Sequence, residues 1–322
     1  MFKTRFISML VLLAAVATGA VAQTTYKVSV KEGTEDATSW TIAPPEATTT
    51  GVAQGTQVTA SYGGVKKVKS VKAVKKAPAG TPLDNTTTAW TAGTFAVPAG
   101  GLTYSDAITV SGDVTLVLTD GETLTLNKGI SLAAGATLTI EGNGTMNVNG
   151  TNGADNNSNS VEASGGSGTA AISGSGTLVL TSGTVTAIGG NGGNVSDSMD
   201  ECKGGHGAAA ISCTLTVNGG TLTATGGNGG SLTNGNGTEG VAGNGGAGIS
   251  GALTVNGGTL TATGGNGGAK SNGPHAQAGT NGRGISSTWT AGTGITFSDS
   301  ADGTSWTANT GTSSTQRYVK AE

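Results

Sequence analysis

Aromatic side chains are scarce in this sequence, and a long middle stretch has none. The 322 residues include four Trp, four Tyr and four Phe, none of them between Tyr104 and Trp289. With 59 glycines in addition, the chain lacks the large side chains that fill a thick globular core. The aromatics that flank this stretch are expected to cap the two ends of a thin-cored structure. They are Trp90, Phe95 and Tyr104 at one end, and Trp289, Phe297, Trp306 and Tyr318 at the other.

Charged residues and long apolar runs are also few. Charged residues make up 11% of the chain, and the net charge of −3 becomes −5 without Lys3 and Arg5. This mild acidity argues against nucleic acid as the main partner. The apolar run Phe6–Val16 is too short to cross a bilayer, and its position after two basic residues predicts a signal peptide over 1–22. We therefore expect no transmembrane segment and an extracellular or cell-surface protein, with the periplasm as the alternative.

Cysteine occurs only twice, at Cys202 and Cys213. Export would permit a disulfide between them, and we expect one that ties a loop to the start of the next repeat. The alternative is two separate thiols, with Cys213 as an apolar core residue. Two cysteines at this spacing give little support for a redox or metal role.

What the chain does contain is internal repetition. Residues 215–230, LTVNGGTLTATGGNGG, recur unchanged at 253–268, and 178–193 form a third, related copy. Each repeat holds two short segments in which apolar and polar residues alternate, the period of a half-buried β-strand. No segment of the mature chain keeps a helical period. The fold class predicted is therefore all-β, with stacked coils that each contact only their neighbours.

The spacing of the repeats predicts a right-handed parallel β-helix, or solenoid, with loops on one side. An isoleucine opens each unit, and the first interval of 22 residues matches one coil of three short strands. The later intervals of 42, 39, 38 and 36 residues must include loops, at about 149–168, 190–207, 227–246 and 264–282. The opening residues are Ile108, Ile130, Ile172, Ile211, Ile249 and Ile285.

Other segments differ from the repeats. Residues 23–77 contain four short alternating stretches and predict a small all-β module, either a β-sandwich or a β-grasp. Residues 78–89 have the composition of a linker. The β-helix is expected over 90–302, followed by a C-terminal cap strand within 303–322.

The repeat units and the N-terminal module together resemble a known group of proteins. The GG-T-x-T-A-x-GG-x-GG units, with Ala-Ala-Ile or Ala-Gly-Ile openings, resemble secreted β-solenoid proteins of gut Bacteroidota. The 25–76 segment is similar to small β-modules of exported proteins from the same bacteria. This resemblance implies an extracellular, carbohydrate-binding or adhesin-like protein. It implies no catalytic motif.

Candidate chemistry in the sequence is limited. A glycosidase needs two facing carboxylates and a lyase needs a placed base, and neither arrangement can be found in equivalent repeat positions. We therefore expect no enzyme and no cofactor. Asp197, Asp200 and Glu201 form the densest acidic group and could hold calcium through oxygen ligands. The alternative is a solvated loop tip.

The loops are the expected contact surface. We predict an exported, non-catalytic protein that binds carbohydrate or a host or bacterial cell surface, weakly and across several coils. The alternatives are a structural spacer that binds nothing specific, and a polysaccharide lyase or hydrolase of the β-helix type. The binding residues expected in the loops are Asn191, Asn194, Asn228, Asn234, Asn236, Asn266 and Asn272.

Overall fold

The computed structural model describes most of the chain beyond residue 79 and short strands before it. The described residues are 26–32, 35–36, 41–43, 59–61, 70–75, 80–157, 162–196, 201–233, 240–270, 273 and 275–322. They contain strands and no helix. The chain divides into two compact units, Met1–Pro78 and Ala79–Glu322. The predicted signal peptide over 1–22 lies outside the described residues.

The first unit contains two small antiparallel arrangements. β1 (Tyr26–Glu32) lies between β2 (Glu35–Asp36) and β5 (Ser70–Lys75), and pairs with β5 over six residues. β3 (Thr41–Ala43) pairs with β4 (Thr59–Ser61). The strands fall within the 23–77 segment that the sequence marked as a β-module.

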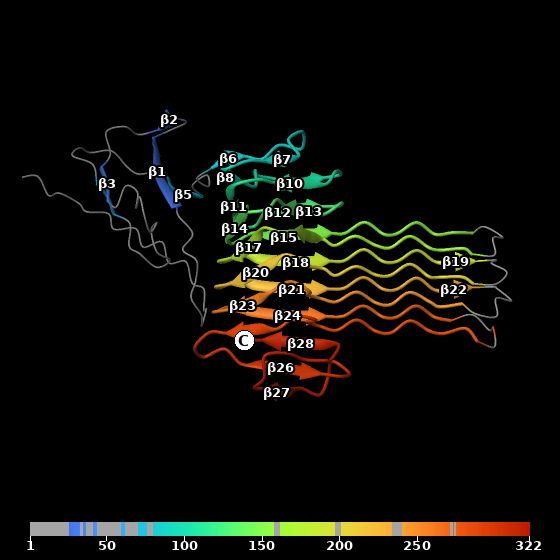
Figure 1. The fold of residues 1–322 in the computed structure, drawn as a ribbon. Coiled ribbons are helices and arrows are strands. Elements are labelled where there is room, and N and C mark those ends of the chain that lie inside the picture. The colour runs from blue at the N-terminus through green and yellow to red at the C-terminus, as the bar shows by residue number, and fades with distance from the viewer. Residues whose placement is uncertain are drawn as a thin grey trace, which may run out of the picture. The chain divides into compact units, whose positions relative to one another are not determined.

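The second unit is a stack of coils whose main strands form three sheets (Figure 1). A separate parallel pair joins β19 (Val195–Ser196) to β22 (Leu232–Thr233) in the long loops. We call the three main sheets the body. The first sheet has the order β25 (Trp289–Ala291), β23 (Leu253–Val255), β20 (Thr214–Val217), β17 (Thr177–Leu180), β14 (Thr137–Gly142), β11 (Asp113–Leu118), β8 (Gly93–Ala96), β6 (Thr81–Pro82). The second has the order β16 (Ile172–Gly174), β13 (Ile130–Leu132), β10 (Ile108–Val110), β7 (Ala89–Trp90).

The third sheet completes each coil and carries the C-terminal cap. Its order is β27 (Thr307–Asn309), β26 (Phe297–Ser300), β28 (Tyr318–Ala321), β24 (Thr259–Thr263), β21 (Thr221–Thr225), β18 (Thr184–Ile188), β15 (Thr145–Asn149), β12 (Thr123–Leu126), β9 (Leu102–Tyr104). From β9 to β24 these strands pair in parallel, as stacked coils require. Parallel coils with no helix confirm the all-β, solenoid-like class.

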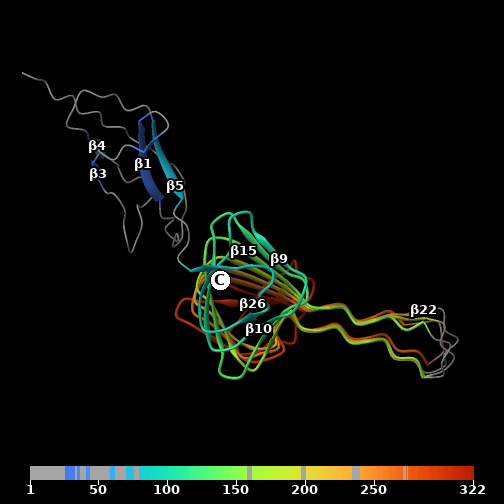
Figure 2. The same cartoon turned by 90° about the horizontal axis from the view of Figure 1, so that it is seen from above.

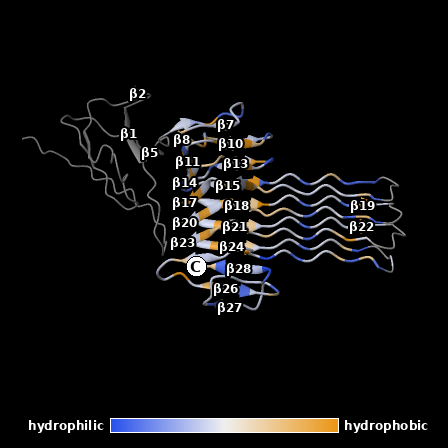
Figure 3. Cartoon of the chain, in the orientation of Figure 1, coloured by the Kyte–Doolittle hydropathy of each residue, from blue (hydrophilic) through white to orange (hydrophobic). Residues whose placement is uncertain are grey.

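The isoleucine alignment read from the sequence is the register of the stack. Ile108 pairs with Ile130, Ile130 with Ile172, and the series continues through single bridges to Ile285. All six isoleucines are buried, in one continuous core with the inward residues of the other strands. In β21, for example, Leu222 and Ala224 are buried while Thr221 is exposed. In Figure 3 the strongly hydrophobic colour accordingly concentrates on the strands of the body.

Both ends of the stack are closed by aromatic rings. Trp90 lies 6.3 Å from Phe95 and 5.9 Å from Tyr104, measured between ring centroids. At the other end Trp289 stacks on Phe297 at 4.6 Å. There β28 pairs antiparallel with β24, so the parallel series of coils stops. The ring contacts are those expected of caps.

The segment expected to be a linker, residues 78–89, has a different role. Its β6 pairs with β8, and Ala89 of β7 pairs with Thr109. Leu83 belongs to the buried core. The stack therefore begins at about residue 80. A short polar stretch can add a strand at the edge of a sheet when the neighbouring coil offers backbone N–H and C=O groups to pair with.

Candidate functional site

The four long loops form a single ordered arm that projects from the body (Figure 1). Each loop leaves the body as an extended outgoing segment and comes back as an extended returning segment. Seen from above, the outgoing and returning segments run as two tracks (Figure 2). We call the four loops layers 1 to 4, and their residues are 150–171, 189–210, 226–248 and 264–284.

The arm has a period of three residues, whereas a strand has two. From Gly189 to Val195 the pattern is two buried residues and one exposed, with Asn191 and Asn194 exposed. The hydrogen bonds follow the same period. The N–H groups of Gly192 and Val195 donate to carbonyls of layer 3, and that of Gly189 donates to Thr225, the last residue of β21. Three residues per turn without internal hydrogen bonds is the geometry of a polyproline II helix.

Hydrogen bonds also join the two tracks. The N–H of Gly190 donates to Thr169 of layer 1, and the carbonyl of Gly190 accepts from Ala208 of its own layer. The same alternation continues to layer 4, where Gly282 donates to Gly265. The arm is therefore a slab two chains thick, in which backbone groups of neighbouring chains satisfy one another.

Glycine is required in the arm by space and not by backbone angle. A Cβ at Gly190 would lie 2.0 Å from the carbonyl oxygen of Thr151, and one at Gly193 would lie 2.0 Å from that of Ala154. Neither glycine has a positive φ. A Cβ at Gly227 or Gly265 would likewise point at a carbonyl of the preceding layer, whereas one at Gly192 or Gly229 would point at a carbonyl of the opposite track in its own layer. The crowding resembles that at the axis of collagen.

Asparagine side chains link the layers along the outer face of the outgoing track. The Oδ1 of Asn152 accepts the backbone N–H of Asn191, that of Asn191 accepts from Asn228, and that of Asn228 accepts from Asn266, each at 2.8 Å. We call these four residues the asparagine column. Its members Asn191, Asn228 and Asn266 were predicted binding residues, and all three are exposed.

A second column lies three residues further along the arm. Asp155 accepts the N–H of Asn194 at 2.6 Å, and Asn194 accepts that of Ser231 at 2.8 Å. Asn194 was also predicted. The returning track has its own version, where His206 Nδ1 accepts from Asn244 at 3.0 Å and Asn244 accepts from Thr280 at 2.9 Å.

Sequence reasoning missed Asn152 and Asn244. Both could have been found by aligning the loops with one another. Each asparagine then falls at the same position as a polar residue of a neighbouring layer, and such positions recur every three residues with small residues between them. The remaining predicted binding residues, Asn234, Asn236 and Asn272, lie outside the described residues.

The predicted calcium ligands are only partly placed. Asp197 and Asp200 lie outside the described residues, and Glu201 is exposed. Within the described ranges no group of three His, Cys, Asp or Glu side chains could hold a metal ion.

The expected disulfide is not formed. Cys202 and Cys213 are both free and buried. Cys202 belongs to a small apolar cluster in the arm with Ala163, Val195, Leu232 and Ala242, while Cys213 belongs to the core of the body. Burial raises the pKa of the Cys213 thiol to about 11. The prediction was wrong because each sulfur fills a separate apolar site.

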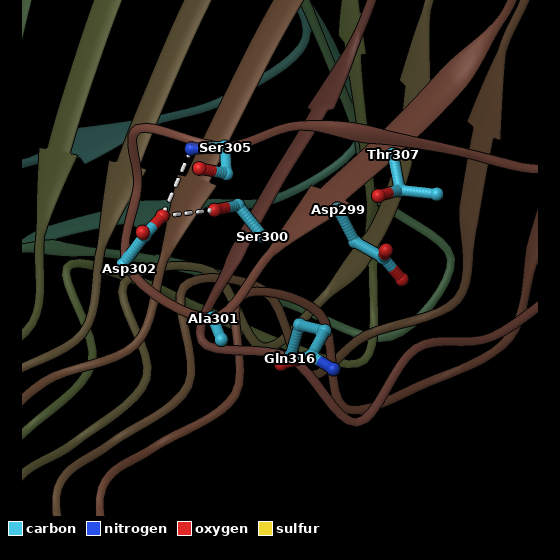
Figure 4. A pocket seen from close by; sticks show the side chains of 7 residues that line it. All are labelled: Asp299, Ser300, Ala301, Asp302, Ser305, Thr307 and Gln316. Carbon is cyan, nitrogen blue, oxygen red and sulfur yellow. Dashed lines mark hydrogen bonds between the residues drawn. The ribbon is translucent and has the colours of Figure 1, made fainter.

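A shallow cavity of about 250 Å³ lies in the C-terminal cap (Figure 4). It is lined by Asp299, Ser300, Ala301, Asp302, Ser305, Thr307 and Gln316. The Asp302 carboxylate accepts the Ser300 hydroxyl at 2.9 Å and two backbone N–H groups of its own turn. Asp299 accepts from Asn309 and Ser314 at 2.7 and 2.6 Å. Both carboxylates therefore hold the cap together, and the arm is the better candidate site.

In the part of the chain that the structure describes, no helix is long and apolar enough to span a membrane. No family model, no curated protein and no solved structure matches the chain.

Proposed function

We propose that this protein is exported and non-catalytic, and that its arm binds carbohydrate or a glycan-bearing cell surface. The observation that supports this most is the asparagine column. Each of its first three carboxamides is fixed through Oδ1 on a backbone N–H of the next layer. The amide NH₂ groups, which only donate, are left for a partner.

Fixed donors favour binding because their side chains lose little freedom when a ligand arrives. Sugar hydroxyl and acetamido oxygens accept such hydrogen bonds. The arm is part of the stretch between Tyr104 and Trp289 that lacks Phe, Trp and Tyr, so none of these three rings is present there for a sugar to stack on. Each contact is then weak, and useful affinity comes from several contacts at once.

Two further features belong to the proposal. The coil is right-handed, because parallel strands joined by a crossover are right-handed in nearly all proteins. Residues 23–77 form a β-sandwich or β-grasp module, which the antiparallel pairing of β1 with β2 and β5 supports. The resemblance of the repeats to secreted Bacteroidota proteins supports export.

The structural-spacer role is the second candidate, and the same columns favour it. Every Oδ1 bond also satisfies a backbone N–H, so the asparagines could serve the arm alone. A polysaccharide lyase or hydrolase has no comparable support among the described side chains.

Replacing asparagine by aspartate separates the two roles. Asp155 already fills an equivalent position and accepts the N–H of Asn194. The double variant N191D/N228D therefore keeps the layer-to-layer bonds but removes two outward donors. We expect glycan-array binding to fall at least tenfold while the melting temperature stays within a few degrees. The N191A/N228A variant, which also loses the acceptors, is expected to lower both.

Unchanged glycan binding by N191D/N228D would contradict the binding role of the column. Absence of binding by the wild-type protein, with the arm folded, would favour the spacer. Release of sugars from pectin or host glycans by the wild-type protein would favour the enzyme.

A further inference from the structure

The asparagine column carries no formal charge. Elsewhere on the outgoing track, one carboxylate is exposed at Asp155 in layer 1 and one ammonium group at Lys270 in layer 4. The returning track carries exposed side chains of both signs, which are Glu162, Glu201, Lys203 and Arg283. A neutral ligand thus fits the asparagine column, where a charged ligand would meet no charge of opposite sign.

The donors of the outgoing face have a regular spacing in two directions. Between layers the spacing is that of paired extended chains, about 4.7–4.9 Å. Between the two columns it is three residues at about 3.1 Å each, or roughly 9 Å. The four members of the asparagine column are thus about one sugar unit apart along the stack, while neighbouring columns are too far apart for adjacent sugars.

We propose that the asparagine column is a subsite row for one neutral, extended, β-linked glycan, whose chain runs along the stacking axis with one sugar on each layer. This inference rests on the proposed function and specifies its ligand. Asn152, Asn191, Asn228 and Asn266 each donate from the amide NH₂ to an oxygen of one sugar. Ser231 and Asn194 of the second column reach substituents on the near side of the chain.

The direction follows from the fixed side chains. Oδ1 of Asn152, Asn191 and Asn228 is in each case held by the backbone N–H of the following layer at 2.8 Å, so these three carboxamides share one orientation. Donors that recur on every layer can each meet a different sugar only if the polymer advances by one sugar for each layer. In a β-1,4-linked chain successive sugars are turned over, so neighbouring layers donate to oxygens on opposite edges of the chain. A chain lying along the arm would meet one donor and then a gap of two glycines.

Length dependence tests this arrangement. Linear β-1,4-linked glucose and N-acetylglucosamine oligomers, from the disaccharide upward, would be titrated calorimetrically into the full chain. Affinity is expected to rise roughly two- to tenfold with each added sugar, the effect of one net hydrogen bond, and to level off at about four units. Charged galacturonate oligomers of equal length should bind at least tenfold more weakly.

Single-layer variants complete the test. N228D should reduce the affinity for the tetrasaccharide and longer oligomers with little effect on the melting temperature. Lys203→Ala, on the returning face, is the control and should change neither. A plateau at the disaccharide, equal binding of galacturonate, or loss of binding in Lys203→Ala would overturn the row while leaving carbohydrate binding intact. Failure of every glycan to bind would instead reject the proposed function.

Discussion

In layers 2 to 4 of the arm, individual positions require glycine because a carbonyl group of a neighbouring chain occupies the space of a side chain. In the body, glycine supplies positive-φ corners, for example at Gly112 and Gly220. In the arm the glycines have ordinary φ and are needed because a neighbouring oxygen occupies the space of a Cβ. Amino-acid composition does not distinguish the glycines of the corners from those of the arm. Only the stacking of the layers does.

Gly190→Ala tests this at one residue. The added Cβ would lie 2.0 Å from the oxygen of Thr151, so layers 1 and 2 must separate locally. We expect a loss of about 1–3 kcal/mol in unfolding free energy. Hydrogen exchange should rise in layers 1 and 2 more than in the body.

Gly311→Ala in the C-terminal cap is the control. The nearest atom to its added Cβ would be the side-chain Oδ1 of Asn309 at 3.1 Å, so no backbone atom would have to shift by as much as in the arm. Equal destabilisation by the two substitutions would show that glycine in the arm is not there to avoid this contact.

At the scale of elements, the strands and the position of the four long loops on one side could be predicted, but the regular layers within the arm could not. Leucine, isoleucine and valine at alternate positions fixed both the strand period and the isoleucine register, because burial selects apolar residues. The arm segments were read as loops. Their three-residue period is carried by Gly and Asn, which no hydrophobic pattern reveals, and their stability comes from backbone groups of other layers.

The two caps of the stack contain turns that we expect to be sensitive to acid. The Thr86 hydroxyl at 2.7 Å and the N–H groups of Thr86 and Thr87 lower the pKa of Asp84 to about 2. Backbone N–H groups of Ser305 and Thr304 lower the pKa of Asp302 well below its usual range. A depressed carboxyl pKa stabilises the folded state above the unfolded pKa, near 3.8, and this contribution is lost as pH falls further.

We therefore expect the caps to loosen between about pH 4 and pH 2, before the core of the body. Tryptophan fluorescence during acid titration reports it, since Trp90 and Trp289 lie at the two ends of the stack. The double variant D84N/D302N keeps an oxygen acceptor without the charge and should flatten this transition. An identical acid transition in the variant would assign the change to other groups.

At the scale of the whole molecule, the question is why the arm stops at four layers. The inner residues Thr151, Ala154 and Thr169 of layer 1 carry side chains where layers 2 to 4 have glycine, with Ala208 as the exception. All three are exposed, and they project where a further layer would sit. At the opposite edge the N–H groups of Gly264 and Gly284, where layer 4 meets the body, donate to Arg317 and Gln316 of the C-terminal tail. Side chains of layer 1 thus hinder pairing with another chain at one edge, and the tail covers the base of the other.

Removing the side chains of layer 1 should open one edge. We expect the triple variant T151G/A154G/T169G to self-associate in a concentration-dependent manner in sedimentation velocity, through stacking of arms. The variant T151A/T169A retains each Cβ and should stay at the wild-type sedimentation coefficient. A triple variant that sediments as the wild type does at every concentration would mean that other contacts close this edge.

Because the arm is rich in glycine and the body is apolar, we expect the stability of the two parts to depend differently on temperature. Unfolding the body exposes Ile, Leu and Val, which raises the heat capacity and makes its stability decline on cooling as well as on heating. Unfolding the arm exposes mainly peptide groups, whose hydration lowers the heat capacity. The arm is therefore expected to have less tendency toward cold denaturation than the body that carries it.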